Sequence, residues 1–447
     1  MAKEKHRNVT VGFVALGCPK NVVDSERMLA QIAEAGFLIA AEPERADVVI
    51  INTCGFIEPA KIESLEVVEQ AVANKEVGNV RKVIVTGCLS QRLGDGLFDE
   101  AAGVDAIVGL EHRDAIVQVI RETLASDEPL AFHSPTPCLT ADDRVRLRIG
   151  PAHSAYLRIS EGCNHRCSFC TIPAIRGPLR SKPLGLVLDE ARELVGSGAV
   201  ELNVIGQDTT VYGRDVEMKE GLASLLAKME KIPDLAWIRL LYAYPTGISG
   251  ELIETIARSE KVLRYIDVPI QHASDRILKA MRRPDTKEAL RDLIERLRSA
   301  MSDIVLRTTV IVGFPGETQN DFDELMEFVR WAQFDALGAF TYFREAGTPA
   351  AEFPDQVPDD LKQDRFDALM RAQQGIAFAK NRERVGSRLT CLIDSLDSQG
   401  TGHGRFYGQA PDIDSICIIR NCAAEPGQLA DVKVVGTQDY DLLAEQI

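Results

Sequence analysis

Short apolar runs alternate with amphipathic helical stretches over the central part of the chain, between residues 153 and 343. Strands that are separated by helices pair in parallel, and right-handed crossovers place those helices on the faces of the sheet. Six runs favour an open, partial (β/α)6 barrel, because a closed barrel of this kind has eight strands. The six runs cover residues 155–160, 201–206, 237–242, 265–270, 307–313 and 337–342, and the helical patterns between them include 184–197 and 274–300.

A shorter version of the same alternation covers residues 8–125 and predicts a parallel-sheet α/β domain. Its apolar runs lie at 9–16, 47–51, 82–86 and 106–108, with helical patterns over 23–35 and 59–74. One cysteine follows each of the first three runs: Cys18, Cys54 and Cys88. Ligands of an open α/β sheet bind outside the carboxyl ends of its strands. We therefore expect the three thiols to converge on one edge of the sheet.

The rest of the chain completes an α/β protein of three domains. Residues 126–152 are rich in Pro, Ser, Asp and Arg and are expected to be a linker. The barrel domain is expected over 153–378, including a crossover helix whose pattern runs over 359–385. Residues 379–447 hold short β runs separated by Gly, Asp and Pro, which is typical of a small all-β barrel. These runs lie at 388–393, 405–409, 415–419 and 432–435.

Composition narrows the class of protein. No stretch approaches the roughly 18 apolar residues of a membrane span, and the N-terminus lacks the apolar core of a secretory signal, so we expect a cytoplasmic protein. The formal net charge is -16, which is a poor basis for neutralising phosphates and suits a basic protein partner better. Nucleic acid is therefore not expected as the direct substrate. Ten cysteines in such a chain indicate metal binding or catalysis rather than disulfides.

The strongest chemical signal is a C-x3-C-x2-C loop directly after the first barrel strand, formed by Cys163, Cys167 and Cys170. Three thiolates on one short loop can hold three irons of a 4Fe-4S cluster. No fourth cysteine lies nearby, and an open metal position can bind a substrate. The alternative is a structural zinc site. Zinc normally takes four ligands, and His165 follows Cys163 by only two residues.

This loop, with an aromatic residue before its last cysteine and a six-unit barrel behind it, resembles the radical S-adenosylmethionine (SAM) superfamily. In that family the amino and carboxylate groups of SAM chelate the unique iron, and cleavage of SAM gives a 5′-deoxyadenosyl radical. The resemblance implies that the protein's part is to position the cofactor and to exclude water.

The three domains together resemble the methylthiotransferases of this superfamily. The resemblance implies that Cys18, Cys54 and Cys88 bind a second 4Fe-4S cluster and that the C-terminal module is a TRAM domain. Four segments are similar to the subgroup that methylthiolates an aspartate of ribosomal small-subunit protein twelve: 15–26, 159–167, 206–213 and 410–414. The transfer-RNA-modifying subgroup has Gln-Asn where this chain has Gln207-Asp208. One departure is Lys182, where Arg is expected, so that an anion contact there is in doubt.

Further cofactor contacts are predicted at the barrel strands. Gln207 and Asp208 follow the second barrel strand, Gly313 follows the fifth, and Arg307 opens the fifth. The loop 313–318 is equally consistent with a plain strand-to-helix turn that has Glu317 in the first helical turn. A lone histidine such as His272 is more often a hydrogen-bonded core residue than a ligand.

The charge of the C-terminal domain is an independent indication of the substrate. From Glu383 to Ile447 ten acidic and five basic residues give a net charge of -5, whereas a module that grips RNA should carry a basic face. The sequence thus predicts a methylthiotransferase that uses SAM, two 4Fe-4S clusters and an electron donor such as flavodoxin or ferredoxin. Two alternatives remain, namely a transfer-RNA adenosine methylthiotransferase and a non-catalytic iron–sulfur scaffold or electron carrier.

Overall fold

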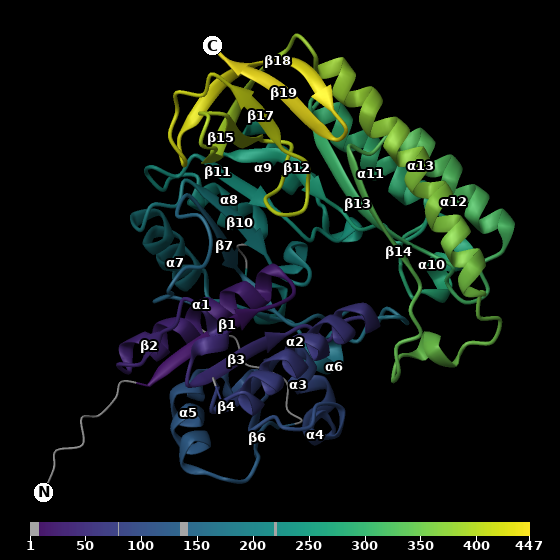
Figure 1. Cartoon of the computed structure of the whole chain (residues 1–447). Coiled ribbons are helices and arrows are strands. Elements are labelled where there is room, and N and C mark those ends of the chain that lie inside the picture. Colours follow the sequence, from purple (N-terminus) through teal and green to yellow (C-terminus); the bar gives the residue numbers. More distant parts are fainter. Residues whose placement is uncertain (1–8, 79, 135–141, 219–220) are drawn as a thin grey trace, which may run out of the picture. The chain divides into compact units, whose positions relative to one another are not determined.

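The computed structural model describes residues 9–78, 80–134, 142–218 and 221–447. These residues form two compact units (Figure 1). The first unit holds the chain up to Gly150 together with residues 160–165 and 170–180, and the second holds residues 151–159, 166–169 and 181–447.

The first unit contains a parallel sheet in the order β2-β1-β3-β4-β5-β6. Its strands are β1 (Thr10–Ala15), β2 (Leu38–Ile39), β3 (Val48–Thr53), β4 (Lys82–Gly87), β5 (Ala106–Val108) and β6 (Leu130–Phe132). The four predicted strands are confirmed. The two edge strands were missed, since two or three residues carry no periodic signal. Because β6 lies inside the expected linker 126–152, part of that segment belongs to the sheet instead.

Helices cover both faces of this sheet. They are α1 (Pro19–Glu34), α2 (Glu58–Glu76), α3 (Cys88–Leu93), α4 (Leu97–Glu100) and α5 (Ile116–Ala125), with the short η1 (Pro43–Arg45), η2 (Gly94–Gly96) and η3 (Leu110–Ala115). Val48 and Ile50 of β3 pack with α1 and α5, whereas Val49 and Ile51 pack with α2, α3 and α4. A strand that is buried on both faces needs a continuous apolar run, which explains why β3 was easy to predict. A separate helix, α6 (Ile172–Arg176), contacts α3.

The second unit contains the predicted six-stranded parallel sheet in the order β14-β13-β12-β11-β10-β7. Its strands are β7 (Ser154–Arg158), β10 (Glu201–Ile205), β11 (Trp237–Leu240), β12 (Val262–Asp267), β13 (Val305–Val312) and β14 (Ala336–Thr341). The sheet has two free edges and so forms an open barrel, as expected. The short strands β8 (Ser160–Glu161) and β9 (Arg180–Ser181), of which all but Ser181 belongs to the first unit, flank the segment that carries the cysteine loop.

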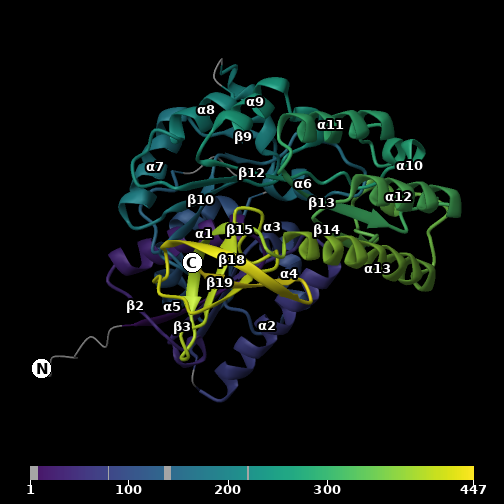
Figure 2. The ribbon, with the colours of Figure 1, turned by 90° about the horizontal axis from the view of Figure 1, so that it is seen from above.

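The helices of this unit lie outside the sheet, and α12 and α13 run side by side along its β13–β14 edge (Figures 1 and 2). They are α7 (Leu184–Gly196), α8 (Leu222–Met229), α9 (Gly250–Arg258), α10 (Asp275–Ala280), α11 (Lys287–Ala300), α12 (Gln319–Ala332) and α13 (Asp359–Arg384), with η4 (Thr209–Val211), η5 (Arg214–Val216), η6 (Pro245–Gly247) and η7 (Pro349–Glu352). No helix in the described part of the chain combines the length and the apolar character that crossing a membrane requires.

Two helical expectations need correction. The single pattern over 274–300 is two helices, because Arg282 adopts a positive φ of 57° and Pro284 follows it between α10 and α11. The expected domain boundary after residue 378 falls inside α13, which continues to Arg384. The C-terminal barrel therefore begins after the helix rather than within it.

The C-terminal segment closes into a five-stranded barrel in the order β15-β16-β17-β19-β18. Its strands are β15 (Arg388–Leu396), β16 (Gly402–Phe406), β17 (Cys417–Arg420), β18 (Leu429–Gln438) and β19 (Asp441–Gln446). Cys391 and Cys417 are buried in its core, where they pack as small apolar side chains. The last strand, β19, was not predicted.

A buried ion-pair cluster joins the small barrel to the sheet of the second unit. Glu201, the first residue of β10, is fully buried and accepts hydrogen bonds from Arg405 at 2.8 Å and from Arg239 at 3.0 Å. Burial alone would raise the pKa of Glu201, but the two guanidinium groups outweigh it and hold this pKa below its usual value. His153, just before β7, pairs with Asp394 at 2.9 Å. The small barrel therefore packs against the amino ends of the strands.

We predict that Glu201→Gln destabilises the chain by about 3–5 kcal/mol, because it leaves two buried guanidinium groups short of a countercharge. Urea unfolding followed by circular dichroism measures the loss. The control is Arg264→Ala, which removes an ion pair with Asp303. Because the two side chains of this pair are 42% and 46% exposed, its loss should cost at most about 1 kcal/mol of stability. Equal losses in the two variants would contradict the prediction.

The loss of stability in the Glu201→Gln variant should depend on pH. Since the folded-state pKa of Glu201 is lowered, its contribution is complete above the unfolded-state value of about 4.3 and disappears as the pH falls through the folded-state value. The difference in stability between the native chain and Glu201→Gln should therefore shrink on acidification below about pH 4. A difference that grew at low pH would contradict this assignment.

Candidate functional site

Three cysteines of the first unit follow neighbouring strands. Cys18 follows β1, Cys54 follows β3 and Cys88 follows β4, and the sheet order places these strands next to one another. The register pairs the strand ends, with Ala15 opposite Asn52. The expected convergence of the three thiols on one sheet edge is a consequence of this order. Their role as cluster ligands stays a prediction.

The electrostatics of the thiols agree with this proximity. Burial raises the pKa of Cys88 to about 12, against the opposing effect of Arg176, and the charges of Cys18 and Cys54 raise it further. Burial also raises the pKa of Cys54, with a further contribution from Cys18. Cys54 and Cys88 are thus both within the field of Cys18, and burial favours the protonated form of these two thiols. Metal binding would have to displace those protons.

Two glycines allow the loops to approach this closely. Gly17 has a φ of +92°, and a Cβ there would lie 2.9 Å from the Cβ of Cys54. Gly87 has a φ of +100°, and a Cβ there would lie 2.4 Å from Oδ1 of Asn52 and 2.5 Å from the carbonyl oxygen of Thr53. Any larger residue would push the cysteine loops apart.

Asn21 ties the loops together, although the sequence analysis assigned no role to this residue. Its Nδ2 donates to the carbonyl oxygen of Leu16, the residue after β1, at 3.0 Å, and to that of Thr53, the last residue of β3, at 2.9 Å. Asn52 in turn donates to the Asn21 carbonyl oxygen at 2.9 Å. The only sequence signal was the position of Asn21 three residues after Cys18, in a segment that carried the family resemblance.

Arg176 is a second residue that the sequence did not single out. It ends α6 and is 1% exposed. Its Nη2 donates to Sγ of Cys88 at 3.3 Å, to Oδ1 of Asn21 at 2.6 Å and to Asp24 at 3.2 Å, while its Nη1 donates to Glu161 at 2.9 Å. No local pattern could have revealed these contacts, because the partners lie 15 to 155 residues away.

The loop with Cys163, Cys167 and Cys170 is anchored separately in each unit. In the first unit the Cys163 amide donates to the Gly177 carbonyl oxygen at 3.0 Å. In the second unit Ser168, next to Cys167, donates through its amide and its hydroxyl to the end of α10, at 3.0 and 2.8 Å. Burial raises the pKa of Cys167, while the charge of Arg283 and a hydrogen bond from it act in the opposite direction. This arginine would stabilise a thiolate at Cys167.

The predicted cofactor contacts Gln207 and Asp208 follow β10, on the carboxyl side of the sheet. Asp208 is buried and accepts hydrogen bonds from the amide of Thr210 at 2.9 Å and from its hydroxyl at 2.6 Å. It therefore holds the turn into η4. A contact of either residue with SAM stays a prediction.

Gly313 follows β13 at the same side, and a Cβ there would lie 2.3 Å from Cγ of Lys362. Its amide donates to Glu317 at 2.7 Å, and Glu317 pairs with Arg365 at 2.9 Å. The helix α12 begins only after the cap Thr318, so that Glu317 precedes the helix instead of lying in its first turn. The loop has the contacts of a well-formed strand-to-helix turn, and its predicted cofactor contact stays a prediction.

Arg307 lies near the amino end of β13 rather than beyond its carboxyl end. It pairs with Asp267 at 2.9 Å and with Asp414 of the small barrel at 3.3 Å. Asp414 also accepts a hydrogen bond from Tyr265 at 2.8 Å. The contacts of Arg307 thus serve the joint between the sheet and the small barrel, and its predicted role in cofactor binding stays a prediction.

Two other residues of the sequence analysis have structural partners. Lys182, found where the family pattern has Arg, forms a buried ion pair with Glu190 at 2.6 Å. His272 is fully buried, its Nδ1 accepts a hydrogen bond from the Ser274 amide at 2.9 Å, and its Nε2 lies 3.6 Å from Glu317. The interpretation of His272 as a core residue agrees with this arrangement.

The chemistry of both cysteine sets fits iron–sulfur clusters. Within the described ranges, no three His, Cys, Asp or Glu side chains are gathered as a single metal ion requires. A 4Fe-4S cubane holds its thiolates farther apart than one ion does, so this geometry does not count against a cluster. For the N-terminal set, three thiols at the ends of neighbouring strands, a cationic donor to Cys88 and glycines that make room are the features that such a group needs.

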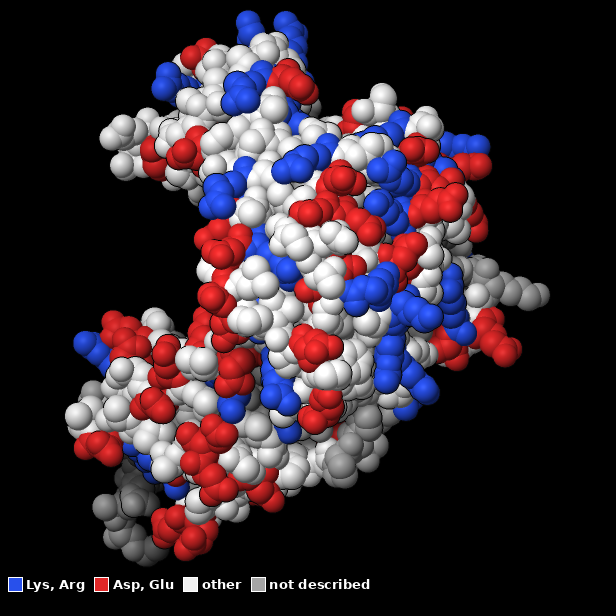
Figure 3. Space-filling model, turned by 90° about the vertical axis from the view of Figure 1, so that its right-hand side faces the viewer, with Lys and Arg blue, Asp and Glu red and all other residues white. Residues whose placement is uncertain are grey.

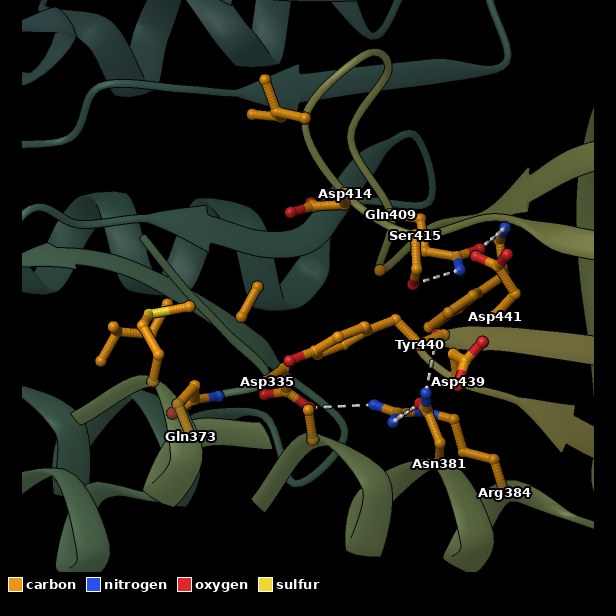
Figure 4. A pocket seen from close by; sticks show the side chains of 17 residues that line it. Asp335, Gln373, Asn381, Arg384, Gln409, Asp414, Ser415, Asp439, Tyr440 and Asp441 are labelled. Carbon is orange, nitrogen blue, oxygen red and sulfur yellow. Dashed lines mark hydrogen bonds and ion pairs between the residues drawn. The ribbon is translucent and has the colours of Figure 1, made fainter. Parts of the chain in front are cut away.

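The cavity of about 470 Å³ in Figure 4 is not part of this chemistry. It lies in the second unit between α13, the small barrel and the start of β14, and its wall includes the ion pair of Arg384 with Asp335 at 2.9 Å. Asp335 precedes β14, so the cavity is at the amino ends of the strands. Sites of such barrels lie at the opposite, carboxyl ends.

Acidic and basic side chains are interspersed over the face in Figure 3. No continuous basic surface covers that face, which agrees with the net charge of -16. A face of this kind lacks the electrostatic signature of a general nucleic-acid binder.

We predict that Gly87→Ala lowers the thermal stability far more than Gly36→Ala. Both glycines have positive φ, of 100° and 86°, but nothing lies within 4 Å of a Cβ at Gly36. The control should therefore cost only the backbone strain of about 1–2 kcal/mol. The Gly87 variant adds a clash with the β3 end, and equal shifts of the unfolding midpoint would contradict the described crowding.

Family models match three segments of the chain. The Radical SAM superfamily matches residues 157–329, the Uncharacterized protein family UPF0004 matches residues 10–109, and the TRAM domain matches residues 385–447. These segments correspond to the partial barrel, the three-cysteine sheet domain and the small barrel. Among solved structures, a radical SAM methyltransferase, TsrM from Kitasatospora setae, has a TM-score of 0.55 at 12% identity and covers 83% of this chain and 89% of its own. That likeness supports the fold.

Curated relatives match over the full length. A ribosomal protein uS12 methylthiotransferase RimO of Geobacter sulfurreducens is 45% identical, with coverage of 100% of this chain and 99% of the relative. A protein of the same name from Trichlorobacter lovleyi is 42% identical, with coverage of 100% and 99%. With this identity over its whole length and all three domain models in their expected order, the chain belongs to the ribosomal protein uS12 methylthiotransferase RimO family of radical SAM enzymes.

Proposed function

We propose that this chain is a radical SAM methylthiotransferase that adds a methylthio group to the β-carbon of an aspartate in ribosomal protein uS12. The observation that carries the proposal is the full-length identity of 45% to a protein named for that activity. The ribosomal location of this substrate implies a cytoplasmic reaction. The electron donor is expected to be a flavodoxin or ferredoxin.

The two cysteine sets have different proposed roles. Membership of the radical SAM superfamily implies a 4Fe-4S cluster and SAM, and Cys163, Cys167 and Cys170 are the proposed ligands. Cys18, Cys54 and Cys88 would hold a second 4Fe-4S cluster. When bound, these groups supply the hydrogen-abstracting radical and the site for the sulfur that is transferred. Acid–base side chains alone could not start this reaction, because an unactivated C–H bond has no acidic proton.

The residues of the chain position the reactants. Ser168 fixes the cysteine loop through its two bonds to the end of α10, and Arg283 faces Cys167. Gln207, Asp208 and Gly313 lie on the carboxyl side of the sheet, where we propose that they border SAM. The small barrel covers the amino ends and thereby leaves that side available for substrate.

Charge favours a basic protein over RNA as the substrate. Residues 383–447, which contain the small barrel, have a net charge of -5. Ribosomal proteins are strongly basic, so complementary charge would accelerate their association with this chain. The Gln207-Asp208 pair, which differs from the transfer-RNA pattern, points to the same choice.

Iron analysis tests the division of the cysteines. We expect about eight irons in the native chain after anaerobic reconstitution, and about four in a Cys18→Ala/Cys54→Ala/Cys88→Ala variant. After reduction, that variant should still cleave SAM but transfer no methylthio group. The matched Cys163→Ala/Cys167→Ala/Cys170→Ala variant should also keep about four irons and lose both reactions. An unchanged iron content in the first variant would exclude the second cluster.

Mass spectrometry tests the substrate. In a strain that lacks this chain, uS12 should lose its methylthio group while transfer RNA keeps its normal adenosine modification. The reverse result would support the transfer-RNA alternative. If reduced protein and SAM produced no 5′-deoxyadenosine, the chain would instead be a scaffold or electron carrier.

A further inference from the structure

We propose that Arg176 is a positioning residue that fixes Cys88 and raises the reduction potential of the N-terminal cluster. This inference rests on the proposed function, because it requires a cluster at Cys18, Cys54 and Cys88. Arg176 belongs to none of the three cysteine-bearing loops of that site. It comes from α6, which follows the C-x3-C-x2-C loop in the sequence but folds with the first unit.

The geometry leaves Arg176 little freedom. Its side chain is 1% exposed, and its donors reach Cys88, Asn21, Asp24 and Glu161 at 2.6 to 3.3 Å. A guanidinium group has a planar fork of donors that lysine lacks, so it can hold a sulfur and several oxygens at once. Asn21, one of these partners, also ties together the ends of β1 and β3. Arg176 therefore fixes Cys88 relative to the loops that carry the other two thiols.

The charges around Arg176 explain why it would act on a cluster. Arg113 lies in the same network, with Asp24 at 2.5 Å and Glu161 at 3.7 Å. The positive charges of Arg176 and Arg113 formally balance the negative charges of the two carboxylates. Thiolate ligands of a cluster would therefore add net negative charge next to the buried guanidinium group of Arg176. Reduction adds one more electron to that cluster. A charged donor to sulfur stabilises the reduced form more than the oxidised form, which raises the potential.

Arg176 also connects the cluster site to the start of the radical loop. Its Nη1 donates to Glu161, two residues before Cys163. The Cys163 amide donates to the carbonyl oxygen of Gly177, the residue after Arg176. The two interactions attach both Glu161 and Cys163 to the end of α6. A shift of Arg176 would therefore disturb the loop as well as Cys88.

A redox titration tests the proposal. The background is the full chain with Cys163→Ala, Cys167→Ala and Cys170→Ala, which leaves one cluster to titrate. Arg176→Gln removes the charge, Arg176→Lys keeps it without the fork, and Arg113→Gln is the matched control. Arg113 shares Asp24 and Glu161 with Arg176, but its described contacts include no thiol. Iron content, circular dichroism and the midpoint potential from electron paramagnetic resonance are measured for each protein.

We expect Arg176→Gln to shift the midpoint potential to more negative values, Arg176→Lys to restore part of the shift, and Arg113→Gln to shift it less. If Arg176→Gln folds but loses its iron while Arg113→Gln retains it, the result supports the fixation of Cys88 by Arg176. The effect on the midpoint potential is then measured with Arg176→Lys. An unchanged potential in the Arg176 variant that retains iron, or a shift no larger than that of Arg113→Gln, overturns the proposal. A background protein with no iron overturns the proposed function itself.

Discussion

The parallel pairing of β1, β3 and β4 is the constraint on which the proposed N-terminal cluster site depends. Each strand ends one or a few residues before a cysteine, and the register aligns the strand ends. The pairing brings together three thiols that lie 36 and 34 residues apart in the sequence, at positions 18, 54 and 88. Gly17, Gly87 and Asn21 then adjust the loops within that frame. Without the sheet, none of these local features would gather the sulfur atoms.

In the second unit, buried charged side chains hold the parts of the fold together. Its small barrel is fixed to the amino ends of the sheet by the buried cluster around Glu201. Such a cluster specifies one arrangement strongly, because any displacement would leave a buried charge without a partner. The small barrel thus lies at the opposite end of the strands from their carboxyl ends, which Gln207, Asp208 and Gly313 follow.

Much of the architecture could be predicted because its signals are local. β3 and the barrel strands are long enough to show an apolar run, and the closed C-terminal barrel follows from several short runs. β2 and β6 were missed because two or three residues have no period, and β19 because its polar residues obscure its pattern. The break between α10 and α11 was present in the sequence as Arg283-Pro284 but was outweighed by the helical pattern on both sides.

By itself, the sequence determined the family resemblance and the two sets of three cysteines that are proposed as cluster ligands. Those properties depend only on residue type and spacing, which are visible without a tertiary structure. Only the tertiary structure decided that Arg176 contacts Cys88, that Arg307 serves the joint with Asp414, and that the small barrel covers the amino ends of the strands. Each of these contacts joins residues far apart in the chain. No local pattern encodes such a contact, because it exists only after the sheet has brought its partners together.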